Sequence, residues 1–122
     1  MKNLIFVTVF LSFLSSPSFG EWKEVGQNSD GVRFIEIDTV RKKESLSYYN
    51  FLMDYFEPSI GGDLSTKGRE VINCKTKKFK ILTQYYFKES MGRGKGEHYH
   101  FPMDWTDFRM DSIIGKSYKS VC

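Results

Sequence analysis

The chain has 122 residues, of which 40% are hydrophobic, and its formal net charge at pH 7 is +3. This length fits one domain rather than two, with a core of modest size. Beyond the N-terminus no segment is long and apolar enough to span a membrane, and so small a net charge indicates no particular partner by itself.

The first 20 residues have the three parts of a secretory signal peptide. Lys2 supplies the positive start, an apolar run occupies residues 4–14, and a polar segment of small residues follows. Ser18 and Gly20 stand at the −3 and −1 positions of a cleavage site. The alternative, a membrane anchor, would need an apolar run of about 20 residues. We therefore expect cleavage after Gly20, a mature domain over 21–122, and export to the periplasm or the outer cell surface.

The mature chain is predicted to consist of short strands separated by turns. Asp30-Gly31, which precedes an alternating apolar run, is typical of a β-hairpin. Tyr49, Phe51 and Met53 fall on one face of the longest segment, and apolar residues occupy the other face too, which indicates a central strand. The predicted strands are Glu21–Val25, Val32–Asp38, Leu46–Phe56, Arg69–Lys75, Lys78–Phe87 and Glu97–Phe101.

Polar or glycine-rich turns and loops are expected between these strands, at 41–44, 57–65 and 91–96. In the strand over 78–87, period two predicts that four aromatic and apolar side chains share one face. These side chains are Phe79, Ile81, Tyr85 and Phe87.

After Pro102 the pattern changes to a helical one. Asp111 or Ser112 is expected to cap the N-terminus of the helix, and Gly115 to weaken it by about 1 kcal/mol relative to Ala. So short a helix is marginal alone and must dock on the sheet. The stripe that would dock consists of Ile114, Tyr118, Val121 and Cys122.

Cys74 and Cys122 are the two cysteines of the chain, and an exported protein matures where disulfides persist. Their pairing would close a loop of about 49 residues and stabilise the fold by roughly 4 kcal/mol. A metal or redox site is the alternative, but neither cysteine has a CxxC partner or an adjacent histidine. We predict a mainly β, α+β fold of about six antiparallel strands. A Cys74–Cys122 disulfide would hold the C-terminal helix on one face, against the strand that carries Cys74.

Basic residues are concentrated between Lys67 and Lys95, where nine of them oppose two acidic residues. Such a stretch can bind nucleic acid, anionic polysaccharide or acidic lipid, or it can be a solvated face whose lysines protect strand edges. Export removes nucleic acid from the expected partners. The candidate partner-binding residues are Lys75, Lys77, Lys78, Lys80, Arg93 and Lys95.

The sequence shows no recognisable catalytic constellation, so no catalytic residue and no cofactor is predicted. The run Gly92-x-Gly94-x-Gly96 lacks both the spacing and the following helix of a phosphate loop. His98 and His100 would share one strand face, and Asp104 could be a third metal ligand, but no fourth ligand is evident. Most aromatic residues are interpreted as sheet packing. Those that could be exposed at an interface are Tyr48, Tyr86 and Trp105.

A sparse pattern of residues follows the order of a known family. An early Trp precedes an aromatic strand that ends in Asp-Thr, Thr-Lys begins the Cys strand, and a Met-Gly-x-Gly turn and a terminal Val-Cys follow. In this order they resemble the surface-adhesin protein E family of exported Gram-negative bacterial proteins, over nearly all of 21–122. The family commonly has Asp where this chain has Asn73. The residues that carry the pattern are Trp22, Phe34, Asp38, Thr39, Val40, Lys42, Lys43, Thr66, Lys67, Cys74, Met91, Gly92, Gly94, Trp105, Ser112, Val121 and Cys122.

The resemblance implies a six-stranded antiparallel sheet with a C-terminal helix held by the disulfide. It also implies adhesion to host extracellular-matrix and serum proteins, as in the founding member. We therefore expect a non-enzymatic binding module for extracellular or envelope proteins, with homodimer formation left open. The alternative is a structural accessory protein of the periplasm or envelope with no adhesive role. A small-ligand or metal binder is a third hypothesis.

Overall fold

The computed structural model describes residues 21–100 and 103–122, so the predicted signal peptide lies outside the described residues. The strands are β1 (Trp22–Gln27), β2 (Gly31–Lys43), β3 (Leu46–Tyr55), β4 (Ser65–Asn73), β5 (Lys78–Phe87), β6 (Gly96–His98) and β7 (Thr106–Asp107). A 3-10 helix, η1 (Ser90–Gly92), precedes β6, and an α-helix, α2 (Ile113–Val121), follows β7.

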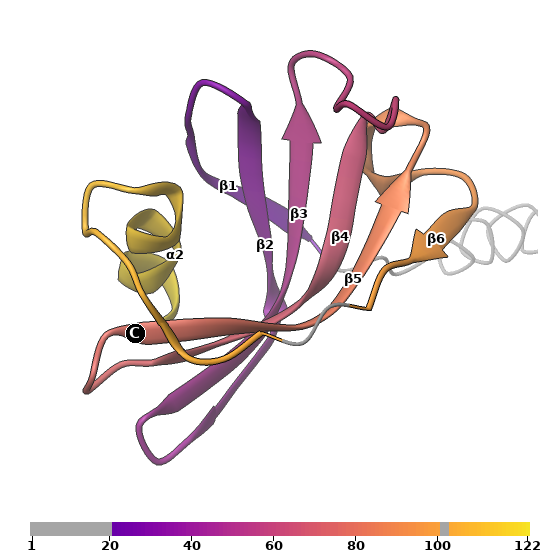
Figure 1. Ribbon diagram of the computed structural model, residues 1–122. Helices are drawn as coiled ribbons and strands as arrows, with labels where there is room; N and C mark the ends of the chain where they lie inside the picture. Colours follow the sequence, from indigo (N-terminus) through magenta and orange to yellow (C-terminus); the bar gives the residue numbers. More distant parts are fainter. Residues whose placement is uncertain (1–20, 101–102) are drawn as a thin grey trace, which may run out of the picture.

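These strands form one antiparallel, strongly twisted sheet in the order β1-β2-β3-β4-β5-β6, with the short β7 paired to β5 (Figure 1). From β1 to β6, strands that are consecutive in sequence are therefore neighbours in space, which makes the sheet a meander. Helix α2 lies on one face of the sheet. The prediction of a mainly β fold with a C-terminal helix is confirmed. Within the described ranges, no helix is long and apolar enough to cross a membrane.

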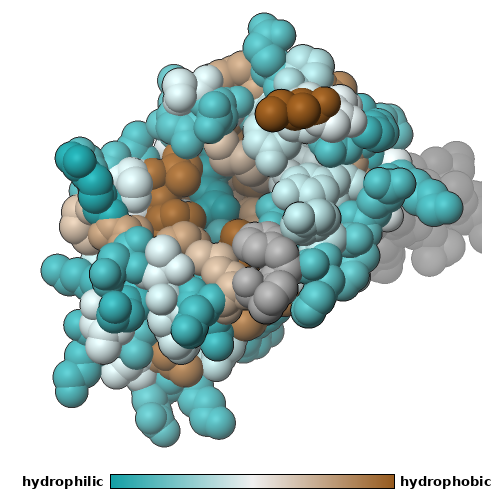
Figure 2. Space-filling model, in the orientation of Figure 1, coloured by the Kyte–Doolittle hydropathy of each residue, from teal (hydrophilic) through white to brown (hydrophobic). Residues whose placement is uncertain are grey.

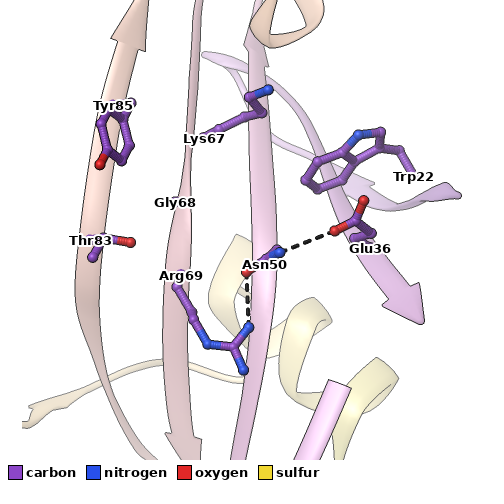
Figure 3. Close-up of a pocket in the computed structure, with 8 residues that line it drawn as sticks. All are labelled: Trp22, Glu36, Asn50, Lys67, Gly68, Arg69, Thr83 and Tyr85. Carbon is purple, nitrogen blue, oxygen red and sulfur yellow. Dashed lines mark hydrogen bonds between the residues drawn. The ribbon is translucent and has the colours of Figure 1, made fainter. Parts of the chain in front are cut away.

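The two faces of the sheet differ in what they carry. We call the face that α2 covers the helix face, and this face holds the core. In the orientation of Figure 1, the surface of the molecule is hollowed near its centre (Figure 2). On the opposite face, hydrogen bonds join Glu36, Asn50 and Arg69 near the middle of the sheet (Figure 3). The buried residues that form this core are Ile35, Tyr49, Phe51, Ile72 and Val121, while Leu52 and Val71 are buried on the opposite face.

Two strands are longer than the sequence patterns predicted. β2 continues through 41–43, predicted as a turn, because these residues pair with the start of β3 and leave a tight turn in which Glu44 has φ 56°. β4 begins at Ser65, inside the predicted loop. Ser65 is fully buried, and its Oγ is satisfied there because it donates to the Glu89 carbonyl at 2.6 Å and accepts from the Gly92 amide at 2.8 Å.

A β-bulge in β5 overturns the prediction that Phe79, Ile81, Tyr85 and Phe87 share a face. Arg69 pairs with Thr83 and the next residue, Glu70, pairs with Ile81, so Leu82 is an extra residue in β5. An extra residue reverses which side chains point to each face beyond it. The side chains after the bulge that share the helix face with Phe79 and Ile81 are therefore Gln84 and Tyr86, whereas Tyr85 and Phe87 are on the opposite face.

Helix α2 begins at a cap that the sequence predicted, since the Ser112 Oγ accepts a hydrogen bond from the Gly115 amide at 3.2 Å. Its body contacts β1 and β2, where Lys116 Nζ donates to the Gln27 carbonyl at 3.2 Å. The second half of the helix also reaches the strand of Cys74, through the Tyr118 hydroxyl and the Cys122 disulfide.

Replacing Gly115 with Ala should destabilise the protein by about 1–3 kcal/mol, the usual cost of overpacking, although Ala is the better helix former. A Cβ at this buried position would lie 2.3 Å from the carbonyl oxygen of Met110, which belongs to the backbone and cannot rotate away. Urea unfolding checks this, with the exposed Lys119→Ala on the same helix as control. If the Gly115→Ala variant were more stable than the wild type, the backbone before α2 would have to move aside at no cost.

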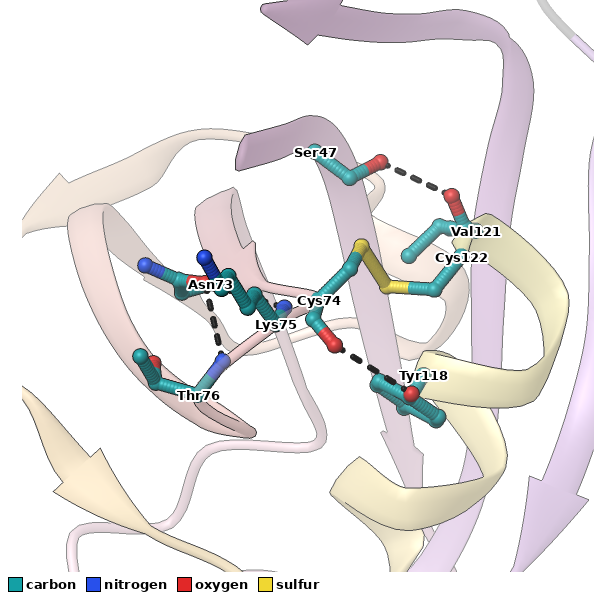
Figure 4. The surroundings of a disulfide bond; sticks show 8 residues. All are labelled: Ser47, Asn73, Cys74, Lys75, Thr76, Tyr118, Val121 and Cys122. Atoms are coloured by element: carbon teal, nitrogen blue, oxygen red, sulfur yellow. Dashed lines mark hydrogen bonds between the residues drawn. A yellow bond between two sulfur atoms is a disulfide. The ribbon is translucent and has the colours of Figure 1, made fainter. Parts of the chain in front are cut away.

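The predicted Cys74–Cys122 disulfide is present and joins the residue after β4 to the residue after α2 (Figure 4). Two hydrogen bonds support the junction: Ser47 Oγ donates to the Val121 carbonyl at 3.0 Å, and Tyr118 Oη donates to the Cys74 carbonyl at 3.3 Å. Termini fray unless they are held, and these bonds hold the end of the helix on the sheet.

Candidate functional site

A groove of about 740 Å³ lies beside the loop between β3 and β4. Three tyrosines from separate segments line it: Tyr55 ends β3, Tyr86 is near the end of β5, and Tyr99 follows β6. The Tyr86 and Tyr99 rings pack with centroids 5.5 Å apart. We call this site the tyrosine groove; the residues that line it are Ser29, Asp30, Tyr55, Glu57, Pro58, Ser59, Ile60, Gly61, Asp63, Tyr86 and Tyr99.

Two tyrosines of the groove have polar surroundings that bear on their hydroxyl groups. Tyr55 Oη and Thr66 Oγ1 are 2.5 Å apart. Burial raises the pKa of Tyr86, and the nearby Tyr55, Tyr99 and Asp63 raise it further. Tyr86 therefore remains a neutral hydroxyl at physiological pH, able both to donate and to accept a hydrogen bond.

The loop that forms one wall of the groove is held in place by its own hydrogen bonds and by neighbouring segments. The backbone carbonyl of Asp63 accepts a hydrogen bond from the Ser59 amide, and Ser59 Oγ accepts one from the Asp63 amide at 3.1 Å. Lys88 Nζ donates to the Gly61 carbonyl at 2.6 Å and lies 3.2 Å from Asp63 Oδ1. The wall is thus fixed before any partner arrives, which lowers the entropy cost of binding.

Apolar side chains are exposed on this loop next to acidic ones. Ile60 is fully exposed and Phe56 is 55% exposed, and Figure 2 shows strongly hydrophobic surface at the upper edge of the molecule, where Figure 1 draws the loop. Asp30, Glu57 and Asp63 line the same groove, and Lys88 forms an ion pair with Asp63. The groove therefore combines apolar and aromatic surface with a net negative charge.

A group of charged and polar side chains is buried under the helix face, where sequence patterns gave no signal. Arg33 of β2 forms two hydrogen bonds with Glu70 of β4, at 3.0 and 2.7 Å, and Tyr49 Oη of β3 donates to Glu70 at 2.7 Å. The guanidinium also lies 4.4 Å from the centre of the Phe51 ring. Burial raises the pKa of Glu70, an effect that Arg33 and Tyr49 oppose. Burial also raises the pKa of Tyr49, so its hydroxyl stays protonated as a donor.

The structure does not bring the six basic candidates together. They form two groups, one before or within the start of β5 and one after its end, and a ten-residue strand spans about 30 Å. Within the first group, Lys78 pairs with Asp107 at 3.0 Å and Lys80 lies 4.8 Å from the Trp105 ring centre. The first group is Lys75, Lys77, Lys78 and Lys80; the second is Arg93 and Lys95.

His98 and His100 lie with ring centroids 6.4 Å apart, and His98 packs on Tyr85 at 5.0 Å. Over residues 21–100 and 103–122, no three His, Cys, Asp or Glu side chains are grouped as metal ligands, and Asp104 is not gathered with the two histidines. Asp104 Oδ1 instead accepts from the Trp105 amide at 2.8 Å. Three aromatic residues are candidates from the sequence for an exposed interface, and in the structure all three are half-buried: Tyr48, Tyr86 and Trp105.

Comparison with known proteins agrees with this fold. Two structures of Haemophilus influenzae protein E have TM-scores of 0.65 and 0.63 at 11% and 9% identity; each alignment covers 88% of this chain, and 91% and 87% of theirs. Protein E from non-typeable Haemophilus influenzae gives 0.58 at 11% identity, over 86% of this chain and 76% of that one. Structural similarity at such low sequence identity shows that these proteins share a fold with this chain. A search of curated protein sequences found no significant match. The family profile described as "Surface-adhesin protein E" matches residues 22–122, and the chain therefore belongs to the surface-adhesin protein E family.

Proposed function

We propose that residues 1–20 are removed on export and that the mature protein, displayed on the outer cell surface, binds a host or extracellular protein through the tyrosine groove. Family membership supports a non-enzymatic, adhesin-like protein. The observation that carries the choice of a protein partner is the groove itself, in which three tyrosines lie beside the exposed Ile60. Tyrosines and large apolar side chains are enriched where protein interfaces gain most of their binding energy.

The charge of the groove supports a partner segment that carries a basic side chain. Asp30 and Glu57 add negative charge beside the tyrosine rings. A Lys or Arg side chain placed there would meet both a carboxylate and an aromatic face, two interactions that favour the same cation. A basic segment with an apolar neighbour would fill the groove and cover Ile60 together.

Replacing Tyr86 with Ala or Ile60 with Asp should weaken binding to immobilised extracellular-matrix or serum proteins by about tenfold or more, the effect of removing an interface anchor. Biolayer interferometry with the purified mature domain measures this. Leu82→Asp is the matched control, because Leu82 is an exposed apolar residue (42%) outside the groove. Equal binding by all variants would exclude the groove as the adhesive surface.

Export and display can be tested separately. The mature protein should begin at Glu21 by intact-mass measurement, and protease added to intact cells should digest it. Protection in intact cells, with digestion only after the outer membrane is opened, would contradict surface display and favour the accessory role in the envelope.

A further inference from the structure

The opposite face of the sheet carries a row of side chains, polar apart from one tryptophan, that runs across five strands. Each member is the direct register partner of the next, from β1 to β5. Neighbouring strands are about 4.8 Å apart, so the row extends over roughly 19 Å. We call it the cross-strand row; its members are Trp22, Glu36, Asn50, Arg69 and Thr83.

The centre of the row is ordered by hydrogen bonds. Asn50 Nδ2 donates to Glu36 Oε1 at 3.1 Å, and Arg69 Nη1 donates to Asn50 Oδ1 at 2.9 Å. Among the described residues, these are the side-chain hydrogen bonds that the structure gives to the Glu36 carboxylate and the Arg69 guanidinium. The second carboxylate oxygen and the other guanidinium nitrogens are therefore oriented but left for a ligand or for water.

A cavity of about 400 Å³ lies over this row, and aromatic rings stand on both sides of it. Figure 3 shows Trp22 on one side and Tyr85 on the other, with Asn50 and Arg69 between them. Lys67 lines the same cavity and adds a second cation, so two positive groups face the one carboxylate of Glu36. The volume lies within the range of small-ligand sites.

We propose that this cavity binds a carboxylated sugar, a pyranose ring that carries a carboxylate. Planar amide, carboxylate and guanidinium groups suit the hydroxyls of such a ring, the two cations suit its carboxylate, and the faces of Trp22 and Tyr85 suit its apolar C–H surface. A peptide strand is a poorer occupant. It binds by pairing its main chain with a sheet edge, whereas the backbone of the central β2, β3 and β4 is already paired on both sides.

The proposal does not depend on the tyrosine groove, which is lined by other residues. A variant could therefore lose adhesion to a protein and still bind the sugar, or lose sugar binding and still adhere.

The test is an NMR titration of the ¹⁵N-labelled mature domain with glucuronate, and with glucose as the neutral control. We expect a Kd of about 1 mM for glucuronate, because so small a ligand in an open site gains only a modest binding free energy. Shifts should centre on Trp22, Asn50 and Arg69, and glucose should bind at least tenfold more weakly. A glucuronate-containing disaccharide and N-acetylmuramate then distinguish a host glycan from a cell-wall fragment as the source.

Arg69→Gln should lower the affinity for glucuronate about tenfold or more, since it removes a charged hydrogen-bond donor, and Trp22→Leu should do so without changing the charge. Arg109→Gln, which removes an exposed arginine outside the cavity, is the matched control. If Arg69→Gln fails to fold, the affinity of Trp22→Leu for glucuronate still tests the proposal. Equal affinity for glucuronate and glucose, or shifts that centre on Tyr86 and Tyr99, would overturn the proposal.

Discussion

Replacing both cysteines with Ser should lower the free energy of unfolding by roughly 4 kcal/mol. Cys74 and Cys122 are separated by 48 positions, and in the chain-entropy model a loop of that length gives about this stabilisation. A domain of about 100 residues has roughly 5–15 kcal/mol in total, so the melting temperature should fall by about 15–30 °C. Urea and thermal unfolding of the double variant measure both quantities.

The loss should appear first in the helix. α2 has nine residues, too few to be stable alone, and without the bond it depends on the packing of Ile114, Tyr118 and Val121 and on the Ser47 hydrogen bond. Hydrogen exchange should therefore show α2 amides losing protection well before those of β3 and β4. Wild-type protein treated with a reductant should behave like the variant. Full protection of α2 in the variant would show that packing alone holds the helix.

Local sequence patterns predicted the parts of this fold that depend on neighbours in the chain. Alternation placed Tyr49, Phe51 and Met53 on one buried face of β3, and the Ser112 cap and the helical stripe located α2. Two cysteines allow only one pairing, so the disulfide needed no knowledge of the sheet. These features follow from the period of the hydrophobic residues, the helix-capping residue and the number of cysteines, all of which a single sequence contains.

Features set by register could not be predicted in this way. The bulge at Leu82 decides that Tyr86, and not Tyr85, reaches the helix face, and no residue type at that point signals it. The tyrosine groove needs three segments that are distant in sequence, and the cross-strand row becomes visible only when five strands are aligned. The spatial division of the basic run is also set by the fold, because β5 separates residues that are close in sequence.

The buried charges are the clearest case. In an alternating strand, Arg33 and Glu70 read as ordinary surface residues, and Glu70 as no more than an acid within a basic stretch. Their exposed fractions are 4% and 0%. Only the alignment of β2, β3 and β4 shows that each is placed to neutralise the other.

Replacing Glu70 with Gln should destabilise the protein by about 3–5 kcal/mol, the usual cost of removing one partner of a buried ion pair. The change keeps the size of the side chain but leaves the Arg33 guanidinium without its counter-charge under the core. Asp111→Asn is the matched control, because Asp111 also makes two hydrogen bonds with an arginine, Arg109, but at an exposed site, and it should leave stability nearly unchanged. A Glu70→Gln variant as stable as the Asp111→Asn variant would show that the buried pair is already compensated by water.

A double-mutant cycle separates the worth of the pair from the cost of breaking it. Arg33→Met alone should be as damaging as Glu70→Gln, because an unpaired carboxylate is left, whereas Arg33→Met with Glu70→Leu should recover most of the loss. If it does, the pair adds little net stability, and its value lies in the alignment of the strands. Arg33, Tyr49 and Glu70 come from three adjacent strands. A slip of one residue in β2 or β4 would put a charge on the opposite face, and a slip in β3 would take the Tyr49 hydroxyl away from Glu70. The recovered double variant should then show faster hydrogen exchange along β2–β4 than the wild type, since the apolar pair fits more than one register. Unchanged exchange would mean that the turns and the disulfide alone fix the register of the sheet.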